Sequence, residues 1–159
     1  MAEIILKQDG LSVKIAALKA QGKQIVLADG CFDLLHVGHV RYLRAAKALG
    51  DILVLALNSD ESVKREKGPG RPLLPLEDRL GVLAAFEMVD FLTSFEGDLE
   101  PLLSSLKPNI YAKRPGHATK SDPSFAGQVI LVKEGMEHTS NKLIHEILRK
   151  YGPLPVKDK

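Results

Sequence analysis

The sequence predicts one α/β domain, built on a parallel sheet of about five strands with helices packed on both faces. Two patterns lead to this prediction. Short runs of apolar and β-branched residues alternate along the chain with segments of helical periodicity. The run at 52–57 is apolar throughout, as is typical of a strand that helices cover on both faces. Such alternation favours βαβ units, in which ligands bind beyond the carboxyl ends of the strands.

The expected strands are short and end in polar or turn-forming residues. They comprise 24–28, 52–57, 90–95, 109–113 and 128–132. Residues able to contact a ligand follow several of these strands, among them Asn58, Asp60, Lys113 and Thr139. We expect these residues to gather along one edge of the sheet, because parallel strands all present their carboxyl ends there.

The expected helices each carry a start or stop signal. They are 40–49, which ends at Gly50; 76–88, which follows Pro75 and begins with acidic residues; 98–106, with Pro101 near its start; and 139–151, which Thr139 or Ser140 can cap. Residues 64–72 are rich in basic residues, glycine and proline, and are expected to form a loop. The domain is expected to span residues 1–152, followed by a polar tail at 153–159.

The composition limits the class of protein. The chain has 159 residues with 45% apolar content, enough for one well-packed core. A formal charge of +2, no tryptophan and 5% aromatic residues count against a nucleic-acid partner. No apolar run approaches the roughly 18 residues of a membrane span, and no signal-peptide pattern is present. A single cysteine excludes an internal disulfide and fits a reducing compartment, so we expect a cytoplasmic protein.

The most informative segment is 29–39, Asp-Gly-Cys-Phe-Asp-Leu-Leu-His-Val-Gly-His, where a predicted strand leads into a predicted helix. His36 and His39 lie three positions apart, with Gly38 between them. The start of a helix offers unpaired N–H groups and a partial positive charge, which suit a phosphate. Imidazole N–H donors at this position can stabilise charge that shifts onto a leaving phosphate. The segment therefore predicts nucleotide chemistry.

Two other interpretations of the histidines stay open at this point. They could bind a metal ion, although the sequence offers no obvious third ligand, or they could serve only the structure. A serine-type triad lacks its G-x-S-x-G motif. A P-loop is absent as well, because Gly68-Pro69-Gly70-Arg71 lacks the Gly-Lys-Ser/Thr ending.

These residues resemble a known family, the cytidylyltransferase-like nucleotidyltransferases with the H-x-G-H signature. The similarity covers about residues 20–150 and is greatest to the branch that adenylylates D-glycero-β-D-manno-heptose 1-phosphate, the ADP-heptose synthases. The residues that carry it are 30–39, 58–65 with 67–68, 71–72 with 75–79, and 139–144. The resemblance implies a Rossmann-like fold, a nucleoside triphosphate with Mg²⁺ carried by the nucleotide, a small phosphorylated acceptor and a homodimer.

The resemblance also implies roles for individual residues. It implies catalysis by His36, His39 and Lys67, with the histidines on the triphosphate. It implies nucleotide binding by Gly30, Cys31, Phe32, Gly38, Lys64, Arg79, Thr139 and Ser140. It implies acceptor binding by Asp33, Asn58, Asp60, Arg71, Lys113, Arg114 and His117. No residue is expected to hold a metal ion by itself.

Several of these residues have a simpler structural interpretation that stays open. Thr139 and Ser140 can act as ordinary helix caps, and Arg79 can pair with an acidic neighbour one or two positions before it. Asp33 can hold a turn or lie near the metal. Cys31 is expected to be a small buried residue rather than a nucleophile, and the basic loop can simply be solvated.

The chain departs from the heptose branch after the fourth predicted strand. Where that branch carries a V-K-G-G-D-Y-type segment, residues 112–117 read Ala-Lys-Arg-Pro-Gly-His. The lysine is kept as Lys113, whereas the aspartate, an acceptor for sugar hydroxyls, is lost. Arg114 adds a charged planar fork, and Pro115 removes a backbone donor. These changes predict that the loop lines the acceptor pocket, that it binds an acceptor more anionic than a neutral-ring sugar monophosphate, and that heptose 1-phosphate is a poor substrate or none. The alternative is a loop that faces solvent.

Nucleotidyl transfer is the expected function. The NMP group of a nucleoside triphosphate, ATP rather than CTP, joins a phosphorylated sugar or a related phosphate monoester, and pyrophosphate is released. The attacking phosphate has a second pKa of about 6, so it is largely ionised at neutral pH and needs no general base. The alternative activities are those of a polyol-phosphate cytidylyltransferase or an FMN adenylyltransferase of the same superfamily. A non-catalytic nucleotide-binding protein is the alternative from another class.

Overall fold

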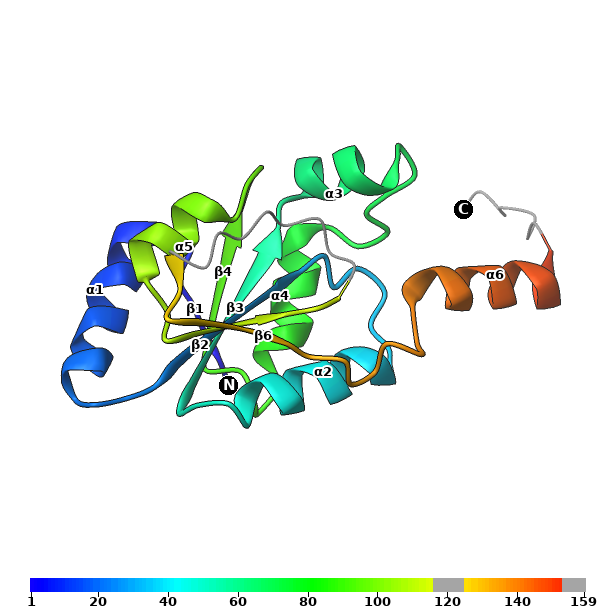
Figure 1. The fold of residues 1–159 in the computed structure, drawn as a ribbon. Coiled ribbons are helices and arrows are strands. Elements are labelled where there is room, and N and C mark those ends of the chain that lie inside the picture. The colour runs from blue at the N-terminus through cyan, green and yellow to red at the C-terminus, as the bar shows by residue number, and fades with distance from the viewer. Residues whose placement is uncertain (116–124, 153–159) are drawn as a thin grey trace.

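The computed structural model describes residues 1–115 and 125–152, and it places six parallel strands in one sheet (Figure 1). The strands are β1 Glu3–Ile4, β2 Ile25–Gly30, β3 Ile52–Asn58, β4 Phe91–Phe95, β5 Ile110–Lys113 and β6 Gln128–Leu131. The α/β class is confirmed, with six strands rather than about five. The additional strand, β1, consists of two residues paired with β4, too few to show an alternating pattern in the sequence.

Six helices are present in the described part of the chain. They are α1 Gln8–Ala20, α2 Val37–Lys47, α3 Asp60–Lys67, α4 Leu76–Ala84, α5 Glu100–Leu106 and α6 Ser140–Tyr151. The four predicted helices are confirmed, although α4 ends at Ala84 rather than at residue 88. The sequence pattern does not predict α1, because only Leu11 and Ile15 of this helix are buried and the apolar stripe is sparse.

The loop predicted at 64–72 is wrong in its first part. Its basic residues continue α3, which Ser59 caps by accepting a hydrogen bond from the Ser62 N–H (3.1 Å). The helix ends at Lys67, and Gly68 follows with a φ of +100°, which favours glycine. The loop therefore begins at Gly68.

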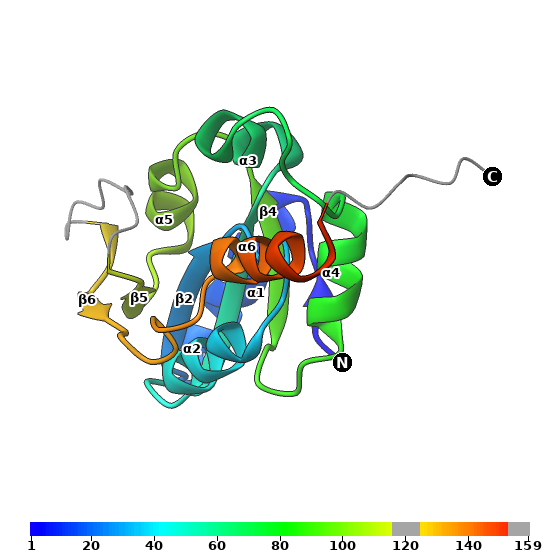
Figure 2. The same ribbon diagram turned by 90° about the vertical axis from the view of Figure 1, so that its right-hand side faces the viewer.

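The helices cover the sheet on both faces (Figure 2). On one face α2 and α4 pack on the strands, with Tyr42, Leu43 and Leu83 fully buried. On the other face α1 and α5 do the same, with Leu11 and Leu103 fully buried. Side chains along a strand alternate between the two faces of the sheet. Because helices cover both faces, both sets of positions in the central strands are apolar.

The strand order, β1-β4-β3-β2-β5-β6, is that of a doubly wound sheet that reverses at β2. From β2 the chain moves outward through β3 to β4 on one side, and through β5 to β6 on the other. Sheets of this kind bind ligands in the crevice at the reversal. Gly30 of β2 pairs with Leu57 of β3, and Ala28 pairs with Ala112 of β5. The carboxyl ends of the three strands therefore meet at one edge, as the sequence predicts.

A buried arginine ties the ends of β2 and β3 together beneath this edge. The Arg79 guanidinium donates to the carbonyl oxygens of Cys31 (2.6 Å) and Asn58 (3.0 Å), and it pairs with Asp60 (2.6 Å). Its Nε donates to the Leu74 carbonyl oxygen (3.1 Å). The side chain is fully buried, and its acidic partner is Asp60 rather than a neighbour on α4, so the surface ion pair considered from the sequence is wrong.

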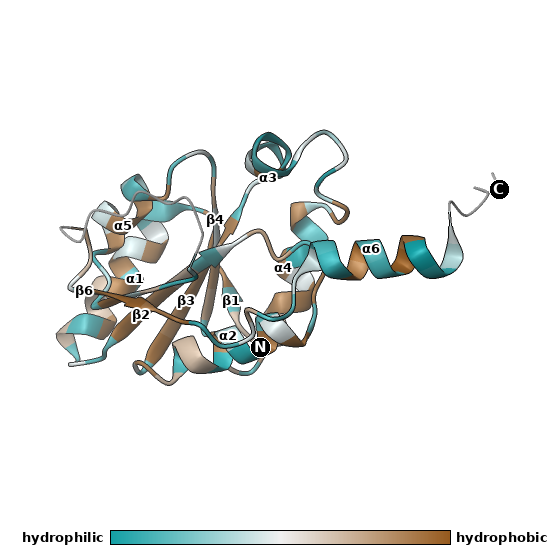
Figure 3. Cartoon of the chain, turned by 45° about the vertical axis from the view of Figure 1, so that its right-hand side comes forward, coloured by the Kyte–Doolittle hydropathy of each residue, from teal (hydrophilic) through white to brown (hydrophobic). Residues whose placement is uncertain are grey.

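Helix α6 stands away from the sheet and the other helices (Figure 3). None of its residues is buried, and apolar side chains on one side of the helix are exposed: Leu143, Ile147, Leu148 and Tyr151. Thr139 caps the helix by accepting a hydrogen bond from the Lys142 N–H (3.2 Å), as predicted. Of the helices in the described ranges, none has the length and apolar character needed to cross a membrane.

Candidate active site

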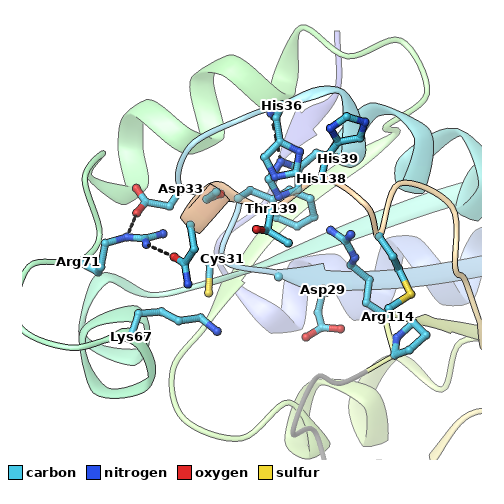
Figure 4. A pocket seen from close by; sticks show the side chains of 16 residues that line it. Asp29, Cys31, Asp33, His36, His39, Lys67, Arg71, Arg114, His138 and Thr139 are labelled. Atoms are coloured by element: carbon cyan, nitrogen blue, oxygen red, sulfur yellow. Dashed lines mark hydrogen bonds and ion pairs between the residues drawn. The ribbon is translucent and has the colours of Figure 1, made fainter. Parts of the chain in front are cut away.

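A cavity of about 310 Å³ opens at the carboxyl ends of β2 and β5 (Figure 4). Its volume is in the range typical of small-molecule sites. Its lining residues are Asp29, Gly30, Cys31, Phe32, Asp33, His36, His39, Lys67, Arg71, Arg114, Pro115, Met136, His138, Thr139, Ser140 and Asn141. The lining comes from four separate segments of the chain, and its basic side chains outnumber its acidic ones. The cavity therefore suits an anionic ligand.

His36 and His39 cap helix α2 with their own side chains. Nδ1 of His36 accepts a hydrogen bond from the Gly38 N–H (3.1 Å), and Nδ1 of His39 accepts one from the His36 N–H (3.3 Å). A neutral imidazole that accepts at Nδ1 carries its proton on Nε2. The two rings are stacked with centroids 3.9 Å apart, so they line the cavity as a pair of Nε2–H donors.

The surroundings of His36 keep its ring neutral. Burial lowers the pKa of His36 below its ordinary value, and the nearby Arg114 and His138 lower it further. At neutral pH the ring therefore acts as a hydrogen-bond donor without carrying a full charge. Such a donor can follow charge that develops on a phosphate and does not have to lose a proton.

Two glycines bring the segment before α6 against the start of α2. A Cβ at Gly38 would lie 2.6 Å from the Gly135 carbonyl oxygen and 2.9 Å from the Cβ of His138. Gly135 has a φ of +77°, and a Cβ there would lie 2.3 Å from the Gly38 carbonyl oxygen. Neither position has room for a side chain. This contact places the His138 ring centroid 6.4 Å from that of His36 and brings Thr139 to the cavity.

Phe32 turns the chain as it leaves β2. Its φ of +47° lies in the left-handed region, which is strained for a bulky residue. Its buried ring packs on His39, with centroids 5.1 Å apart, and on Tyr42 at 6.5 Å. A Cβ at Gly30 would lie 2.9 Å from this ring, so glycine is needed there too. The strained turn directs the chain from the end of β2 to the His36 cap.

Asp33 holds the loop that follows α3. Its carboxylate accepts hydrogen bonds from the N–H groups of Leu73 (2.7 Å) and Leu74 (2.9 Å) and forms an ion pair with Arg71. Burial opposes its ionisation, but these partners lower the pKa of Asp33 below its ordinary value. Arg71 also donates to Oδ1 of Asn141 (3.3 Å), which links the loop to the start of α6. Of the roles considered for Asp33, the structure favours holding the turn.

Cys31 lines the cavity as a neutral thiol. Burial, together with the nearby Glu66, raises the pKa of the thiol to about 11. Reactive cysteines instead have thiols whose pKa is lowered. The expectation that Cys31 is not a nucleophile is consistent with this environment, although the side chain is half-buried rather than buried.

Asp29 brings a carboxylate into this basic cavity. The residue is 5% exposed, and its Oδ1 accepts a hydrogen bond from the Tyr111 hydroxyl (2.7 Å). Burial raises the pKa of Asp29 from 3.8 to about 6, although the Tyr111 bond acts in the opposite direction. A buried carboxylate that is ionised at neutral pH is costly to the fold.

The cavity brings together most of the residues expected in the site. Those that line it are Gly30, Cys31, Phe32, Asp33, His36, His39, Lys67, Arg71, Arg114, Thr139 and Ser140. Four segments therefore meet at one edge of the sheet: the histidine segment, the loop after α3, the segment after β5 and the α6 cap.

Other expected residues do not line the cavity. The Arg79 guanidinium is buried where it binds the Asn58 carbonyl oxygen and the Asp60 carboxylate, and the ligand contacts expected for these three residues stay predictions. Lys64 is exposed on α3, and Lys113 ends β5. Gly38 lies behind the cavity, where it allows the close approach of Gly135. His117 lies outside the described residues.

Sequence reasoning missed Asp29, Met136, His138 and Asn141 as lining residues. Two signals could have found them. Asp29 directly precedes Gly30 in the histidine segment, and His138 directly precedes the predicted α6 cap. Both residues are next in sequence to residues that were expected in the site. A residue beside a strand end or a helix start lies close to the ligand that binds there.

The fold and the site together define a class of protein. A doubly wound sheet with an H-x-G-H segment capping the helix at its switch point is the framework of a nucleotidyltransferase. A family model described as cytidylyltransferase-like matches residues 27–152. The chain belongs to the cytidylyltransferase-like family, and the resemblance found in the sequence is confirmed.

Curated relatives of the chain carry the name bifunctional protein HldE. The chain is 43% identical to the one from Pelobacter propionicus over 155 residues, which cover 93% of this chain and 32% of the relative. It is 45% identical to the one from Geobacter metallireducens over 151 residues, covering 91% and 31%. The chain thus spans about a third of the length of these relatives.

A solved structure has a similar fold. The lipopolysaccharide core biosynthesis protein from Thermoplasma volcanium is 26% identical to this chain, with a TM-score of 0.61. The superposition covers 71% of this chain and 98% of that one. The likeness supports the doubly wound architecture independently of the residues at the site.

Gly38→Ala tests the contact between α2 and the segment before α6. We expect a loss of roughly 1–3 kcal/mol in the free energy of unfolding, because the new methyl group must push the Gly135 backbone away. Urea titration monitored by circular dichroism measures it, and hydrogen exchange should quicken around residues 135–140. Gly81→Ala is the matched control: Gly81 lies in α4 with open space around it, and alanine there should stabilise by up to about 1 kcal/mol. Equal stability of the wild type and the Gly38 variant would contradict the prediction.

Asp29→Asn is expected to stabilise the protein at neutral and alkaline pH. The substitution removes a buried charge and keeps an oxygen that can accept from Tyr111. The expected gain in the free energy of unfolding is on the order of 2–3 kcal/mol. The folded-state pKa, about 6, lies above the ordinary 3.8, so the wild type gains stability as the pH falls through this range. The advantage of the variant should be complete above about pH 6 and vanish near pH 4.

Urea titrations across this pH range measure the difference between the two proteins. Asp98→Asn, at an exposed aspartate, is the control and should show no comparable stabilisation. A difference that stays constant with pH would mean that the buried charge of Asp29 is not its origin.

Proposed function

We propose that the protein is an adenylyltransferase that joins AMP from ATP to a phosphorylated sugar and releases pyrophosphate. The observation that carries this proposal is the His36–His39 pair, two stacked imidazoles whose Nδ1 atoms accept main-chain N–H groups and whose rings line the cavity. The pair lies at the N-terminus of α2 in a basic cavity, in a chain of the cytidylyltransferase-like family. The resemblance to the heptose branch makes D-glycero-β-D-manno-heptose 1-phosphate the first acceptor to test, and residues 112–117 predict that a more anionic sugar phosphate is the better substrate.

The reaction forms one P–O bond and breaks another at the α-phosphorus of ATP. A phosphate oxygen of the acceptor attacks this phosphorus, and the bond to the β-phosphate breaks, so that pyrophosphate leaves with the electron pair. The attacking oxygen is already ionised at neutral pH, so no protein base is required. The protein lowers the barrier by holding both phosphates in line and by stabilising the charge that moves onto the leaving group.

The cavity supplies donors for this purpose. His36 and His39 are placed to donate from Nε2 to phosphate oxygens, supported by the partial positive charge at the start of α2. Lys67 and Arg114 lie on opposite sides of the cavity (Figure 4), where Lys67 can bind the triphosphate and Arg114 the phosphate of the acceptor. Thr139 also lines the cavity, at the start of α6.

Mg²⁺ is proposed to arrive with the nucleotide. No group of three or more His, Cys, Asp or Glu side chains that could hold a metal ion is found among residues 1–115 and 125–152. Triphosphate oxygens are common ligands of this ion, and the bound ion neutralises part of their charge. The histidines are proposed to bind phosphate directly rather than through the ion.

The segment after β5 is proposed to bind the acceptor. Arg114 and Pro115 line the cavity, and Arg114 donates to the Gly135 carbonyl oxygen (3.3 Å) with its guanidinium over the Tyr42 ring, 5.2 Å from the centroid. A guanidinium held in this way can bind a phosphate with two parallel hydrogen bonds. We infer that Arg114 takes the phosphate of the acceptor.

Release of pyrophosphate from ATP or CTP, with a panel of sugar phosphates, tests the proposed function. We expect turnover that depends on both ATP and an acceptor, and lower turnover with CTP. His36→Ala and His39→Ala should each lower turnover by about 10²–10³-fold, because each removes a preorganised donor to transition-state charge. His145→Ala, at an exposed histidine on α6, is the matched control and should leave turnover unchanged.

The other outcomes point to the alternative functions. A clear preference for CTP would favour a polyol-phosphate cytidylyltransferase, and transfer to FMN an FMN adenylyltransferase. Calorimetric binding of ATP without turnover of any acceptor would favour a non-catalytic nucleotide-binding protein. Normal turnover in both histidine variants would remove the pair from the mechanism.

We also propose that the protein forms a homodimer through α6. The family resemblance implies a dimer, and the apolar side of α6, formed by Leu143, Ile147, Leu148 and Tyr151, is exposed. A twofold axis beside α6 would cover the apolar side of both copies. Light scattering should give about 35 kDa, twice the chain mass of 17.4 kDa, and Ile147→Glu should give a monomer. Leu73→Glu, at an exposed leucine outside α6, should stay dimeric, and a monomeric wild type would contradict the proposal.

A further inference from the structure

Asp29 stands out among the cavity residues because its charge opposes the expected ligand. The other acid of the lining, Asp33, is neutralised by Arg71 and by two backbone N–H groups. Asp29 forms no ion pair within residues 1–115 and 125–152, although the nearby charge of Lys113 favours its ionised form, and its Oδ1 accepts a hydrogen bond from the Tyr111 hydroxyl. A carboxylate repels a phosphate, so Asp29 needs another kind of partner in a phosphate-binding cavity.

The sheet register places Asp29 beside the segment proposed to bind the acceptor. Ala28 of β2 pairs with Ala112 of β5, so the next residues in parallel strands, Asp29 and Lys113, are neighbours at the sheet edge. Arg114 follows directly and lines the same cavity as Asp29 (Figure 4). The cavity therefore has an anionic group and a cationic group at its acceptor end.

A guanidinium and a carboxylate at one end of a cavity suit a ligand that carries two different functional groups. The Arg114 guanidinium suits a phosphate, and a carboxylate oxygen is a strong acceptor for hydroxyl groups. A sugar phosphate carries both, because its ring hydroxyls lie near its phosphate. The aspartate that the heptose branch carries after the fourth strand is absent from residues 112–117, and Asp29 provides a carboxylate from the neighbouring strand.

We propose that Asp29 is the hydroxyl-binding residue of the acceptor site, with the oxygen that Tyr111 does not hold accepting a hydrogen bond from a sugar hydroxyl. Tyr111 is a positioning residue that fixes the carboxylate through its hydroxyl. The substrate class is then a polyhydroxylated sugar phosphate rather than a phosphate monoester without hydroxyls. This inference rests on the proposed function, since it names the chemistry of the acceptor in the same site.

A pair of acceptor probes isolates the hydroxyl contact. D-Mannose 1-phosphate and cyclohexyl phosphate both carry a phosphate on a six-membered ring, but the second has no hydroxyl groups. The sugar phosphate with the highest turnover in the panel serves as the reference acceptor, and cyclohexyl phosphate is measured as its competitor. Asp29→Ala should raise the KM for the sugar phosphates by about 10–100-fold, as expected for a lost hydrogen bond to a charged group. The inhibition constant of cyclohexyl phosphate and the KM for ATP should change less than about twofold.

Two tyrosines provide a matched control for the positioning role. Tyr111→Phe removes the hydroxyl that holds Asp29 and should raise the KM for sugar phosphates with little change in the KM for ATP. Tyr42→Phe removes an equally buried hydroxyl, which donates instead to the Ala112 carbonyl oxygen (2.7 Å). This variant should leave the ratio of the KM for sugar phosphates to the KM for ATP unchanged. Circular dichroism establishes that each variant is folded, and Asp29→Asn, which keeps the side-chain shape, should give an intermediate KM.

The outcomes separate this inference from the proposed function. If the wild type transfers AMP to sugar phosphates and Asp29→Ala leaves their KM unchanged, the inference is overturned and the proposed function stands. An equal change for sugar phosphates and cyclohexyl phosphate also overturns it, because the residue would then act on the phosphate or on the fold. If the wild type releases no pyrophosphate with any acceptor, the proposed function fails and the inference fails with it.

Discussion

At the start of α2 the chain meets the segment that precedes α6, and neither Gly38 nor Gly135 has room there for a Cβ atom. Much of the site depends on this approach. The Gly135 carbonyl oxygen accepts a hydrogen bond from Arg114, and Glu137, two residues further on, pairs with Arg41 of α2. Residues that follow β5 and residues that precede α6 are thus positioned against the same helix end. A shift at this contact would move the basic groups of the cavity relative to the two histidines.

The interaction that starts α2 also sets the chemistry of the site. Helix N-caps are usually Ser, Thr, Asp or Asn, whose oxygens accept a backbone N–H. Here Nδ1 of His36 takes that role, and Nδ1 of His39 accepts from the His36 N–H. Both bonds place the imidazole proton on Nε2, so one pair of contacts caps the helix and selects the tautomer that can donate to a phosphate. Mutation of either histidine therefore affects a cap as well as a ligand contact, which is why a fold measurement must accompany each activity measurement.

Most of the fold follows from local sequence patterns, because the central strands are apolar and the predicted helices have clear caps. The elements that the pattern misses are those whose stability comes from tertiary contacts: β1 is two residues paired with β4, and α1 has a sparse apolar stripe. At the site, residue type and motif spacing place the histidines and the α6 cap. They do not distinguish Arg79, which is buried among carbonyl oxygens, from Arg114, which lines the cavity. The partners of an arginine are decided by which segments the fold brings together, and one sequence does not contain that information locally.

Two features of the cavity reduce the stability of the fold. Phe32 has a strained backbone conformation, and Asp29 is a carboxylate whose ionisation burial disfavours. Asp29 is the next-to-last residue of β2 and Phe32 follows the strand, at the point where the strand order reverses. The two faces of the sheet are otherwise packed with apolar side chains. Packing rules disfavour such residues at these positions, so the only sequence signal for Asp29 is its place directly before Gly30 in the histidine segment. A residue that costs stability and that no packing requirement explains is best accounted for by the ligand it meets. In the acceptor site that we propose, this ligand group is a sugar hydroxyl, which can donate a hydrogen bond to the carboxylate.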